Sequence, residues 1–271
     1  RRDVATDGRR AVVAFSTDWK EDAERRDFTI NALYANPDTG EIFDYFDGLN
    51  DLENRHVRFI GNAETRIAED HLRILRYFRF FARFGEDKAD PEAIAACAHA
   101  AKSLMALSRE RIANELLRIL ALPRPLRALT VMAEHGIFAN FLPELADNMP
   151  ALFARLQKRE AEFGIAPSPL ARLIAILTDD AQIVDRVAMR LKLSNRMRGD
   201  LAARIGNRHP TSTDIRPIAY HDGVECARDC AMLYATDGDL PASLGKLENW
   251  APPEFPVKGR DIIARGIVAG P

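Results

Sequence analysis

The chain has 271 residues, of which 47% are hydrophobic and 29% charged, an ordinary composition for a soluble globular protein. Its 38 basic and 40 acidic side chains give a formal net charge of -2, so a nucleic-acid site would have to come from local clustering of arginines. No apolar run approaches the roughly 20 residues that cross a membrane, and no apolar segment follows the basic N-terminus as in a secretory signal. The three cysteines suit a reducing compartment, so we expect a cytoplasmic protein.

Residues 1–60 mix strand and helix signals. The patterns predict a buried strand at 11–17, a charged helix at 21–28, and a β-hairpin over 30–46 that turns at 37–40. They then predict a turn with a short helix at 47–54, and another strand at 56–60.

After Gly61 the pattern becomes helical, with stops at glycines and prolines such as Gly85 and Pro143. Helices are predicted at 63–84, 91–101, 108–121, 123–136, 149–162, 168–178, 180–192 and 195–206. From about residue 207 the chain is richer in Pro, Ser and Gly, with short helices predicted at 217–236 and 259–266. The expected fold class is therefore α+β, a small mixed α/β part followed by a long all-helical part.

Polar residues open the stretch "RRDFTINALY" (25–34). Arg25 and Arg26 could grip phosphates with two hydrogen bonds each, Asp27 could accept from a ribose hydroxyl, and Asn31 could fix backbone or ligand. The same residues could instead form a solvated helix end with local ion pairs, which are common and nearly neutral in energy. The residues alone leave both interpretations open.

A second cluster lies in "EDHLRILRYFRFFARFG" (69–85). Helical spacing puts four arginines on one face about 120° wide; they are Arg73, Arg76, Arg79 and Arg83. The only acidic residues nearby in this stretch are Glu69 and Asp70, one turn before Arg73. The face therefore carries an excess of positive charge that would suit phosphates or RNA. The alternative is an amphipathic helix whose acid–arginine pairs only support the helix.

Carboxylates also gather in "DYFDGLNDL" (44–52), which contains Asp44, Asp47, Gly48 and Asp51. A metal site is one interpretation. The spacing differs from that of a calcium-binding loop, and we favour a turn with Asn50 or Asp51 as the helix cap.

The stretch "LSRERIANELL" (107–117) predicts a well-capped helix. Ser108 is the expected N-cap, and Arg111 and Glu115 have the spacing to pair along the helix. Elsewhere, Cys226 and Cys230 lack a second Cys/His pair for zinc, and "YHDG" (220–223) lacks the partners of a metal site. We expect both to be structural.

Four of these stretches, taken in order, resemble motifs of the class II (bacterial-type) tRNA nucleotidyltransferase and poly(A) polymerase family. "RRDFTINALY" resembles the sugar- and triphosphate-binding motif, and "DGLNDL" (47–52) resembles the hinge motif. "EDHLRILRYFRF" (69–80) resembles the nucleobase-recognition helix, and "SRERIANEL" (108–116) resembles the helix that braces it. The likeness covers residues 1–145 firmly and the rest more loosely.

The resemblance implies roles for each residue of the first motif and of the hinge. Asp27 would contact the ribose, Arg25 and Arg26 would hold the triphosphate, and Asn31 would shape that pocket. The hinge would consist of Asp47, Gly48 and Asp51.

It implies that protein, not nucleic acid, is the template. Asp70 and Arg73 would pair with the incoming base, accepting C and A and rejecting G and U. Arg76 would orient that pair, and Arg111 would brace the base-reading helix.

It also implies a two-metal reaction, in which carboxylates on a Gly-Gly/Asp-x-Asp motif and a following strand hold Mg²⁺. In the family these precede a flexible loop, which "RRDVATDGRR" (1–10) resembles. We therefore expect a chain truncated at both ends, with Mg²⁺ ligands upstream of Arg1, and we assign no catalytic or metal residue within it.

The implied activity is the addition of CCA to tRNA 3′ ends from CTP and ATP. On this interpretation the chain contains the end of a nucleotidyltransferase head (1–60), a helical neck (61–125), a helical body (126–206) and a tail (207–271). The acceptor and TΨC side of tRNA would lie along body and tail. Poly(A) polymerase, or an enzyme restricted to CC or A addition, stays open. So do a catalytically incomplete RNA-binding helical protein and a helical domain whose arginine face docks a protein.

Overall fold

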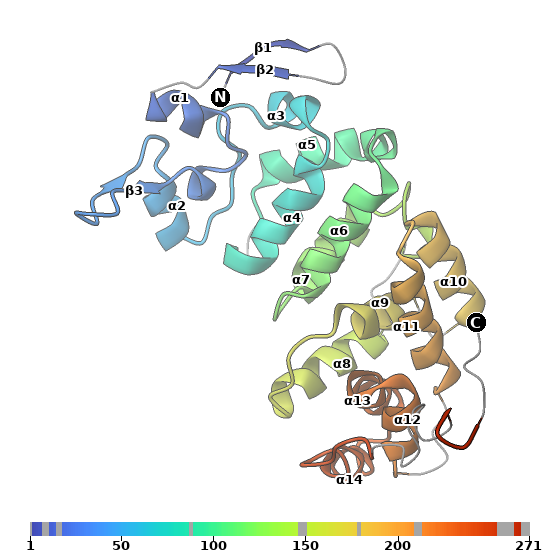
Figure 1. Ribbon diagram of the computed structural model, residues 1–271. Helices are drawn as coiled ribbons and strands as arrows, with labels where there is room; N and C mark the ends of the chain where they lie inside the picture. Colours follow the sequence, from blue (N-terminus) through green and yellow to red (C-terminus); the bar gives the residue numbers. More distant parts are fainter. Residues whose placement is uncertain are drawn as a thin grey trace. The chain divides into compact units, whose positions relative to one another are not determined.

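The computed structural model describes residues 2–6, 11–14, 18–86, 89–145, 151–177, 180–208, 213–253 and 263–266. The chain divides into two compact units, residues 1–198 and 199–271 (Figure 1). The first unit holds all the strands among the described residues, and it is helical from residue 63 onward. This agrees with the α+β class predicted from the sequence.

The N-terminal strands form a small antiparallel sheet. β1 (Arg2–Thr6) pairs with β2 (Ala11–Ala14), so the strand predicted at 11–17 is present in its described part. β1 also lies in the stretch where the resemblance implied a flexible loop. An isolated strand leaves its backbone groups unpaired, and β1 supplies the partner for β2.

α1 (Trp19–Glu24) is capped by Asp18, whose side chain accepts from the backbone N–H groups of Lys20 and Glu21. The helix predicted at 21–28 ends at Glu24. It ends early because Phe28 adopts an extended conformation and bridges to Phe59, the only β pairing described within the strand predicted at 56–60.

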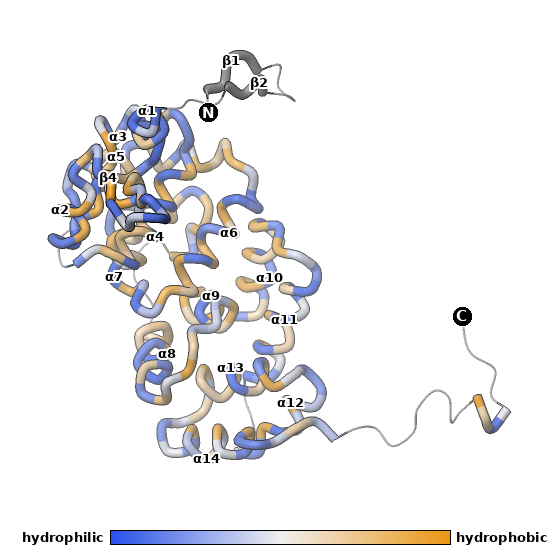
Figure 2. The backbone as a smooth tube through the Cα atoms, turned by 60° about the vertical axis from the view of Figure 1, so that its left-hand side comes forward, coloured by the Kyte–Doolittle hydropathy of each residue, from blue (hydrophilic) through white to orange (hydrophobic). Residues whose placement is uncertain are grey.

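The predicted hairpin is present but short, with β3 (Tyr34–Ala35) paired to β4 (Ile42–Phe43). The 3₁₀ helix η1 (Thr29–Asn31) occupies its expected first residues. Asn36 stabilises the turn, because its side chain accepts from the backbone N–H groups of Asp38 and Thr39. The apolar β4, orange in Figure 2, is exposed to solvent.

α2 (Gly48–Glu53) follows the hairpin, and Asp44 caps it from four residues upstream. The Asp44 carboxylate accepts from Gly48 N at 2.9 Å and from Leu49 N at 2.8 Å. The predicted cap at Asn50 or Asp51 is therefore wrong: both residues lie inside the helix, and Asp51 is buried.

The helix predicted at 63–84 is interrupted and forms α3 (Ala63–Glu69) and α4 (Arg73–Phe84). Asp70 is extended at the break, and its carboxylate accepts from the backbone N–H of Leu72 at 3.1 Å. An aspartate that bonds the following backbone competes with helix continuation, which explains the break.

The remaining helices follow the prediction closely up to residue 206. They are α5 (Pro91–Ala100), α6 (Arg109–Leu120), α7 (Leu126–Glu134), α8 (Ala151–Glu162), α9 (Pro169–Leu177), α10 (Ala181–Arg190) and α11 (Asn195–Gly206). Two 3₁₀ helices lie between them in stretches where the sequence predicted almost no helix, η2 (Ala101–Ala106) and η3 (Pro143–Leu145).

The second unit continues with α12 (Arg216–Asp222), α13 (Val224–Tyr234) and α14 (Leu240–Gly245). One helix was predicted at 217–236, but Gly223 (φ +92°) divides it. Most of the helix predicted at 259–266 lies outside the described residues. Among the described helices, none is long and apolar enough to cross a membrane.

Aromatic packing joins the "RRDFTINALY" segment to α4. The Phe28 ring lies 4.8 Å from that of Phe80 and 5.0 Å from that of Phe59, which stacks on Tyr77 at 5.6 Å. Buried aromatic pairs of this kind add about 0.5–1.5 kcal/mol each beyond their area burial. The polar residues flanking Phe28 are thereby held against the start of α4.

A buried ion pair ties together helices farther along the first unit. Arg172 on α9 is 1% exposed and pairs with Glu160 on α8, which is 5% exposed. The same guanidinium donates to the carbonyls of Leu120, Leu122 and Pro123 at the end of α6. A cation at a helix C-terminus also interacts favourably with the helix dipole. We call this group the Arg172 clamp.

Candidate functional site

Asp70, the residue expected to read a base, is held from two sides. Its Oδ2 accepts from Arg111 Nη2 at 2.8 Å, and its Oδ1 accepts from Leu72 N at 3.1 Å. The resemblance implied that Arg111 braces the base-reading helix, and in the structure the Arg111 side chain bonds Asp70, three residues before α4 begins. The predicted pairing of Arg111 with Glu115 is wrong, because Arg111 reaches across to Asp70 instead.

Arg73 is fixed separately and does not pair with Asp70. Its Nη1 donates to Glu69 Oε2 at 2.5 Å and to the Arg66 carbonyl at 2.9 Å. Its Nη2 donates to the Arg25 carbonyl at 3.2 Å, across 48 residues of chain. Burial opposes the charge of Glu69, but Arg73 and Arg66 outweigh it and lower the pKa of this carboxyl.

Asp27 is the most buried of the predicted nucleotide-binding residues, with 4% of its surface exposed. Its Oδ1 accepts from Asn31 Nδ2 at 2.9 Å, and its Oδ2 accepts from Arg76 Nε at 2.5 Å. Burial disfavours the Arg76 charge, but the Asp27 carboxylate more than compensates and raises the pKa of that guanidinium. Asn31 and Arg76 therefore fix the orientation of Asp27.

Arg25 and Arg26 lie at the end of α1 and form local pairs. Arg25 pairs with Glu21 at 3.5 Å and Arg26 with Asp22 at 3.2 Å, each four residues back along the helix. These are the ion pairs that the alternative interpretation of this stretch expected. Exposed pairs of this kind contribute about 0–1 kcal/mol, so a phosphate could displace them at little cost.

The arginine face of α4 is more nearly neutral than its sequence indicates. Arg79 Nε lies 2.8 Å from Glu115 Oε2 on α6, and Arg76 pairs with Asp27. Among the described residues, Arg83 makes no ion pair. The predicted excess of positive charge is therefore wrong: Asp27 and Glu115 from other segments balance Arg76 and Arg79, Glu69 balances Arg73, and only Arg83 lacks an acidic partner among the described residues.

Glu115 is a residue that the sequence interpretation assigned to the wrong partner. It is buried, and it binds both Arg79 and Arg118. A signal for this was present, because helical spacing puts Glu115 on the same face as Ile112 and Ile119. A carboxylate on an apolar face requires a cationic partner from a neighbouring element.

The predicted hinge residues pack the first helices together. Asp47 has φ +63°, and Gly48 approaches the backbone so closely that a Cβ there would meet the Thr29 carbonyl oxygen at 2.4 Å. Asp51 accepts from Thr29 Oγ1 at 2.5 Å and pairs with Arg58 at 2.7 Å. These contacts support the turn interpretation of the carboxylate cluster. A hinge motion stays a prediction.

No three His, Cys, Asp or Glu side chains of the described residues are grouped so that they could hold a metal ion. Asp44 is committed to capping: burial opposes its charge, but the backbone N–H groups of Leu49, Gly48 and Phe46 lower its pKa. The residues present therefore do not fit a magnesium site, and we derive no metal-dependent step from them.

Two family models match the chain. Residues 1–58 match the poly(A) polymerase head domain, and residues 88–149 match a probable RNA- and SrmB-binding site of polymerase A. The first match contains Asp27 and its partner Asn31, and the second contains Arg111.

Proteins with similar sequences point the same way. The chain is 38% identical over its full length to mouse mitochondrial CCA tRNA nucleotidyltransferase 1, and it spans 64% of that protein. It is 30% identical to a CCA-adding enzyme of Levilactobacillus brevis, a match that includes 98% of this chain and 68% of the bacterial one. The chain thus spans about two thirds of the length of these relatives.

Solved structures share the fold. The Bacillus stearothermophilus CCA-adding enzyme in complex with CTP superposes with a TM-score of 0.65 at 25% identity, over 95% of this chain and 67% of that one. A Thermotoga maritima CCA-adding enzyme complexed with tRNA gives 0.59 at 23% identity, over 93% and 66%. Together with the sequence matches, these likenesses show that the chain belongs to the class II tRNA nucleotidyltransferase and poly(A) polymerase family.

Proposed function

We propose that this chain carries the nucleotide-selecting part of an enzyme that adds CCA to tRNA 3′ ends from CTP and ATP. One observation carries the proposal. Arg73 bonds the Arg25 carbonyl, and Arg76 bonds Asp27, so α4 and the "RRDFTINALY" segment form one hydrogen-bonded framework. Groups suited to phosphate, ribose and base therefore lie on connected elements.

Ribose and triphosphate would bind to residues of different character. Each Asp27 oxygen already accepts one hydrogen bond, and a carboxylate oxygen has a second lone pair that a ribose hydroxyl can use. Arg25 and Arg26 have only weak partners to lose, and a guanidinium binds phosphate with two parallel bonds. The buried residue would thus supply orientation and the exposed ones charge.

Base selection would rest on Asp70 and Arg73. Cytosine and adenine each present an amino donor beside a ring-nitrogen acceptor, which an acceptor from Asp70 and a donor from Arg73 would match. Uracil and guanine present a carbonyl instead, and this would leave a protein group unpaired at a cost of about 1–3 kcal/mol. Arg111 would act as a positioning residue, because its bond to Asp70 fixes the carboxylate before the nucleotide arrives.

In the reaction, a tRNA 3′-hydroxyl would attack the α-phosphate and pyrophosphate would leave. The described residues would bind and orient the nucleotide. The Mg²⁺ ions that the resemblance implies would need ligands other than the described residues of this chain.

The domain roles belong to the same proposal. Residues 1–60 would complete a head, 61–125 would form the neck with the base-reading helix, and 126–206 and 207–271 would carry the acceptor and TΨC side of tRNA as body and tail. A cytoplasmic location stays a prediction, since the mouse relative is mitochondrial by name.

Calorimetry on the chain tests the binding half of the proposal. We expect saturable binding of CTP and ATP and weaker binding of UTP and GTP. Asp70→Ala or Arg73→Ala should remove this preference. Arg118→Ala is the matched control, because Arg118 is exposed on the bracing helix and, among the described residues, forms an ion pair with Glu115 alone. Equal binding of all four nucleotides would contradict base selection.

Activity assays on the full-length gene product test the reaction. Addition of C and A to a tRNA lacking CCA, with Mg²⁺ present, is the expected result. Processive addition of A to unrelated RNA would favour poly(A) polymerase, and RNA binding without transfer would favour a non-catalytic protein.

A further inference from the structure

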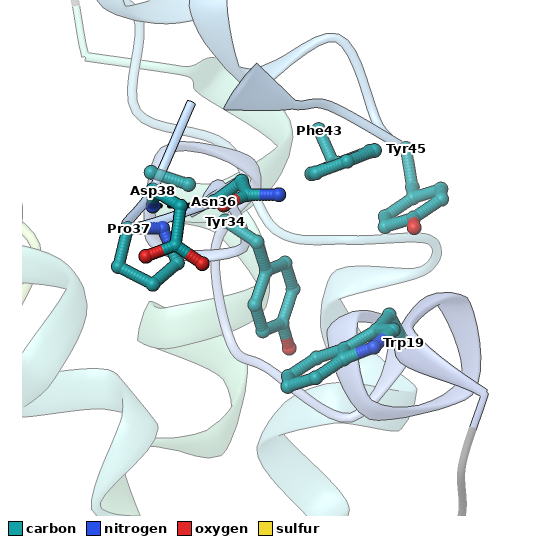
Figure 3. Close-up of a pocket in the computed structure, with 8 residues that line it drawn as sticks. Trp19, Tyr34, Asn36, Pro37, Asp38, Phe43 and Tyr45 are labelled. Carbon is teal, nitrogen blue, oxygen red and sulfur yellow. Dashed lines mark hydrogen bonds between the residues drawn. The ribbon is translucent and has the colours of Figure 1, made fainter. Parts of the chain in front are cut away.

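A pocket of about 420 Å³ lies between α1 and the β3–β4 hairpin, and none of its lining residues has a role in the proposed nucleotide site. Four aromatic side chains line it, with Asn36 and Asp38 at the turn; they are Trp19, Tyr34, Phe43 and Tyr45 (Figure 3). Its size is that of a small-ligand or side-chain pocket.

The rings are held in place before any ligand binds. Trp19 meets Tyr34 edge-on at 5.3 Å, and Tyr34 meets Tyr45 in the same way at 6.4 Å. The Tyr34 hydroxyl donates to Asp22 Oδ2 at 2.7 Å, which fixes the central ring. A preorganised pocket loses little entropy when it binds.

Charge around the pocket selects the kind of ligand. From Asp27 to Asn54 every charged residue is an aspartate or a glutamate. Asp38 and Glu41 on the hairpin are exposed and make no ion pair within the described chain. This surface repels the phosphates of RNA and attracts cations.

Basic residues also lie close by in sequence: Lys20 is on α1, and Arg25 and Arg26 follow its last residue. Arg26 is paired with Asp22, and its guanidinium lies 6.0 Å from the centre of the Tyr34 ring. One cation therefore already lies near the central ring of the pocket, and an aromatic ring beside carboxylates favours a second.

Apolar groups extend the surface around the pocket. Trp19 is 64% exposed and Ile42 is 53% exposed, although both are large and hydrophobic. Exposed tryptophan and tyrosine anchors with apolar neighbours are typical of protein–protein contacts. A free small cation would leave these side chains uncovered.

We propose that the hairpin pocket binds the guanidinium or ammonium group of an arginine or lysine carried by a basic protein segment with apolar neighbours. The rings supply cation–π contacts, Asp38 and Glu41 supply charge, and Trp19 and Ile42 contact the flanking apolar side chains.

Trp19 fluorescence tests this in the Trp250→Phe chain, where Trp19 is the only tryptophan left. The probes are an acetylated Leu-Arg-Leu-Arg-Leu peptide and its citrulline counterpart, which has the same shape without the charge. We expect a saturable change in Trp19 fluorescence with the arginine peptide. The affinity for the citrulline peptide should be at least about tenfold weaker. Tyr45→Ala should weaken arginine binding about threefold to tenfold through loss of one ring.

Exposed charges provide variants that do not disturb packing. Asp38→Asn with Glu41→Gln should weaken arginine binding and reduce its salt dependence, whereas Glu162→Gln, an exposed acid on α8, should leave both unchanged. Equal affinity for the arginine and citrulline peptides overturns the proposal. A saturable change in Trp19 fluorescence with a CCA trinucleotide, which the peptide does not reverse, would make the pocket an RNA site. This result would also overturn the proposal. A saturable change in Trp19 fluorescence with spermidine, which the peptide does not reverse, would make the pocket a small-cation site and would overturn the proposal as well.

Discussion

Two groups of arginine–carboxylate pairs in the first unit differ in how completely their hydrogen bonds are used. The Arg172 clamp is almost wholly buried, and its guanidinium bonds one carboxylate and three carbonyls. The Arg111–Asp70 and Arg73–Glu69 pairs are partly exposed, and their side chains have hydrogen-bonding capacity that these pairs do not use. The first arrangement holds helices together, and the second could still bind a ligand.

The contrast teaches that an ion pair is a candidate site only when it combines fixed orientation with unused hydrogen-bonding capacity. Asp27 lies between the two cases, since it is as buried as Glu160 but has lone pairs free. Each prediction below changes one of these groups and asks whether stability or ligand binding responds.

Arg172→Met should have the largest effect on stability. It leaves Glu160 buried without its cation and removes the donor for three carbonyls, so the free energy of unfolding should fall by about 3–5 kcal/mol. Urea denaturation measures the change. The double variant with Glu160→Leu should recover part of the loss. CTP affinity at low temperature, where the variant stays folded, should equal that of the wild type; a loss of affinity there would contradict a purely structural clamp.

Asp27→Asn should affect both stability and binding. The new amide faces the Arg76 donor in place of a carboxylate oxygen, so the free energy of unfolding should fall by about 1.5–3 kcal/mol. If Asp27 accepts from a ribose hydroxyl, the preference for CTP over dCTP should also decrease. Calorimetry with both nucleotides measures this ratio. An unchanged ratio together with a lowered stability would mean that Asp27, like Arg172, has a structural role only.

Arg111→Ala should change stability by about 1 kcal/mol or less, because its pair with Asp70 is partly exposed. Its effect should be on selectivity: discrimination between CTP and UTP should fall, because the proposed role of Arg111 is to position Asp70. The double variant Arg111→Ala/Asp70→Ala should discriminate no worse than Asp70→Ala alone, since both act through one carboxylate. Additive losses would mean that Arg111 has a separate contact.

The sequence predicted the helical elements and the site motifs more completely than their partners. Helix-forming periodicity and capping residues are local, so α5 to α11 lie near their expected bounds. The breaks at Asp70 and Gly223 depend on single residues within otherwise helical patterns, and the sequence interpretation missed both.

Partners across the fold were harder to predict, because residues far apart in the sequence provide them. Asp27 with Arg76, and Asp70 with Arg111, span 49 and 41 residues. The Arg111–Glu115 pair was predicted from helical spacing, which carries no information about partners on other elements. The sequence therefore proposed the side chains of the candidate site, while the structure shows how they bond to one another.

The smallest predicted effect concerns the pH dependence of a partly exposed pair outside the site. Arg190 donates two hydrogen bonds to Glu144, and this lowers the pKa of the Glu144 carboxyl below its ordinary value of 4.5. A depressed carboxyl pKa stabilises the fold above the ordinary value, and the contribution disappears as pH falls through the lowered pKa. Glu144→Gln should therefore cost about 1 kcal/mol or less at pH 7 and progressively less below pH 4.5, so the melting temperatures of variant and wild type should converge in acid. A constant difference between the two melting temperatures down to pH 3 would mean that the charge of Glu144 contributes nothing. The pair would then differ from the Arg172 clamp in kind and not only in degree of burial, because its two hydrogen bonds would be replaceable by those of water.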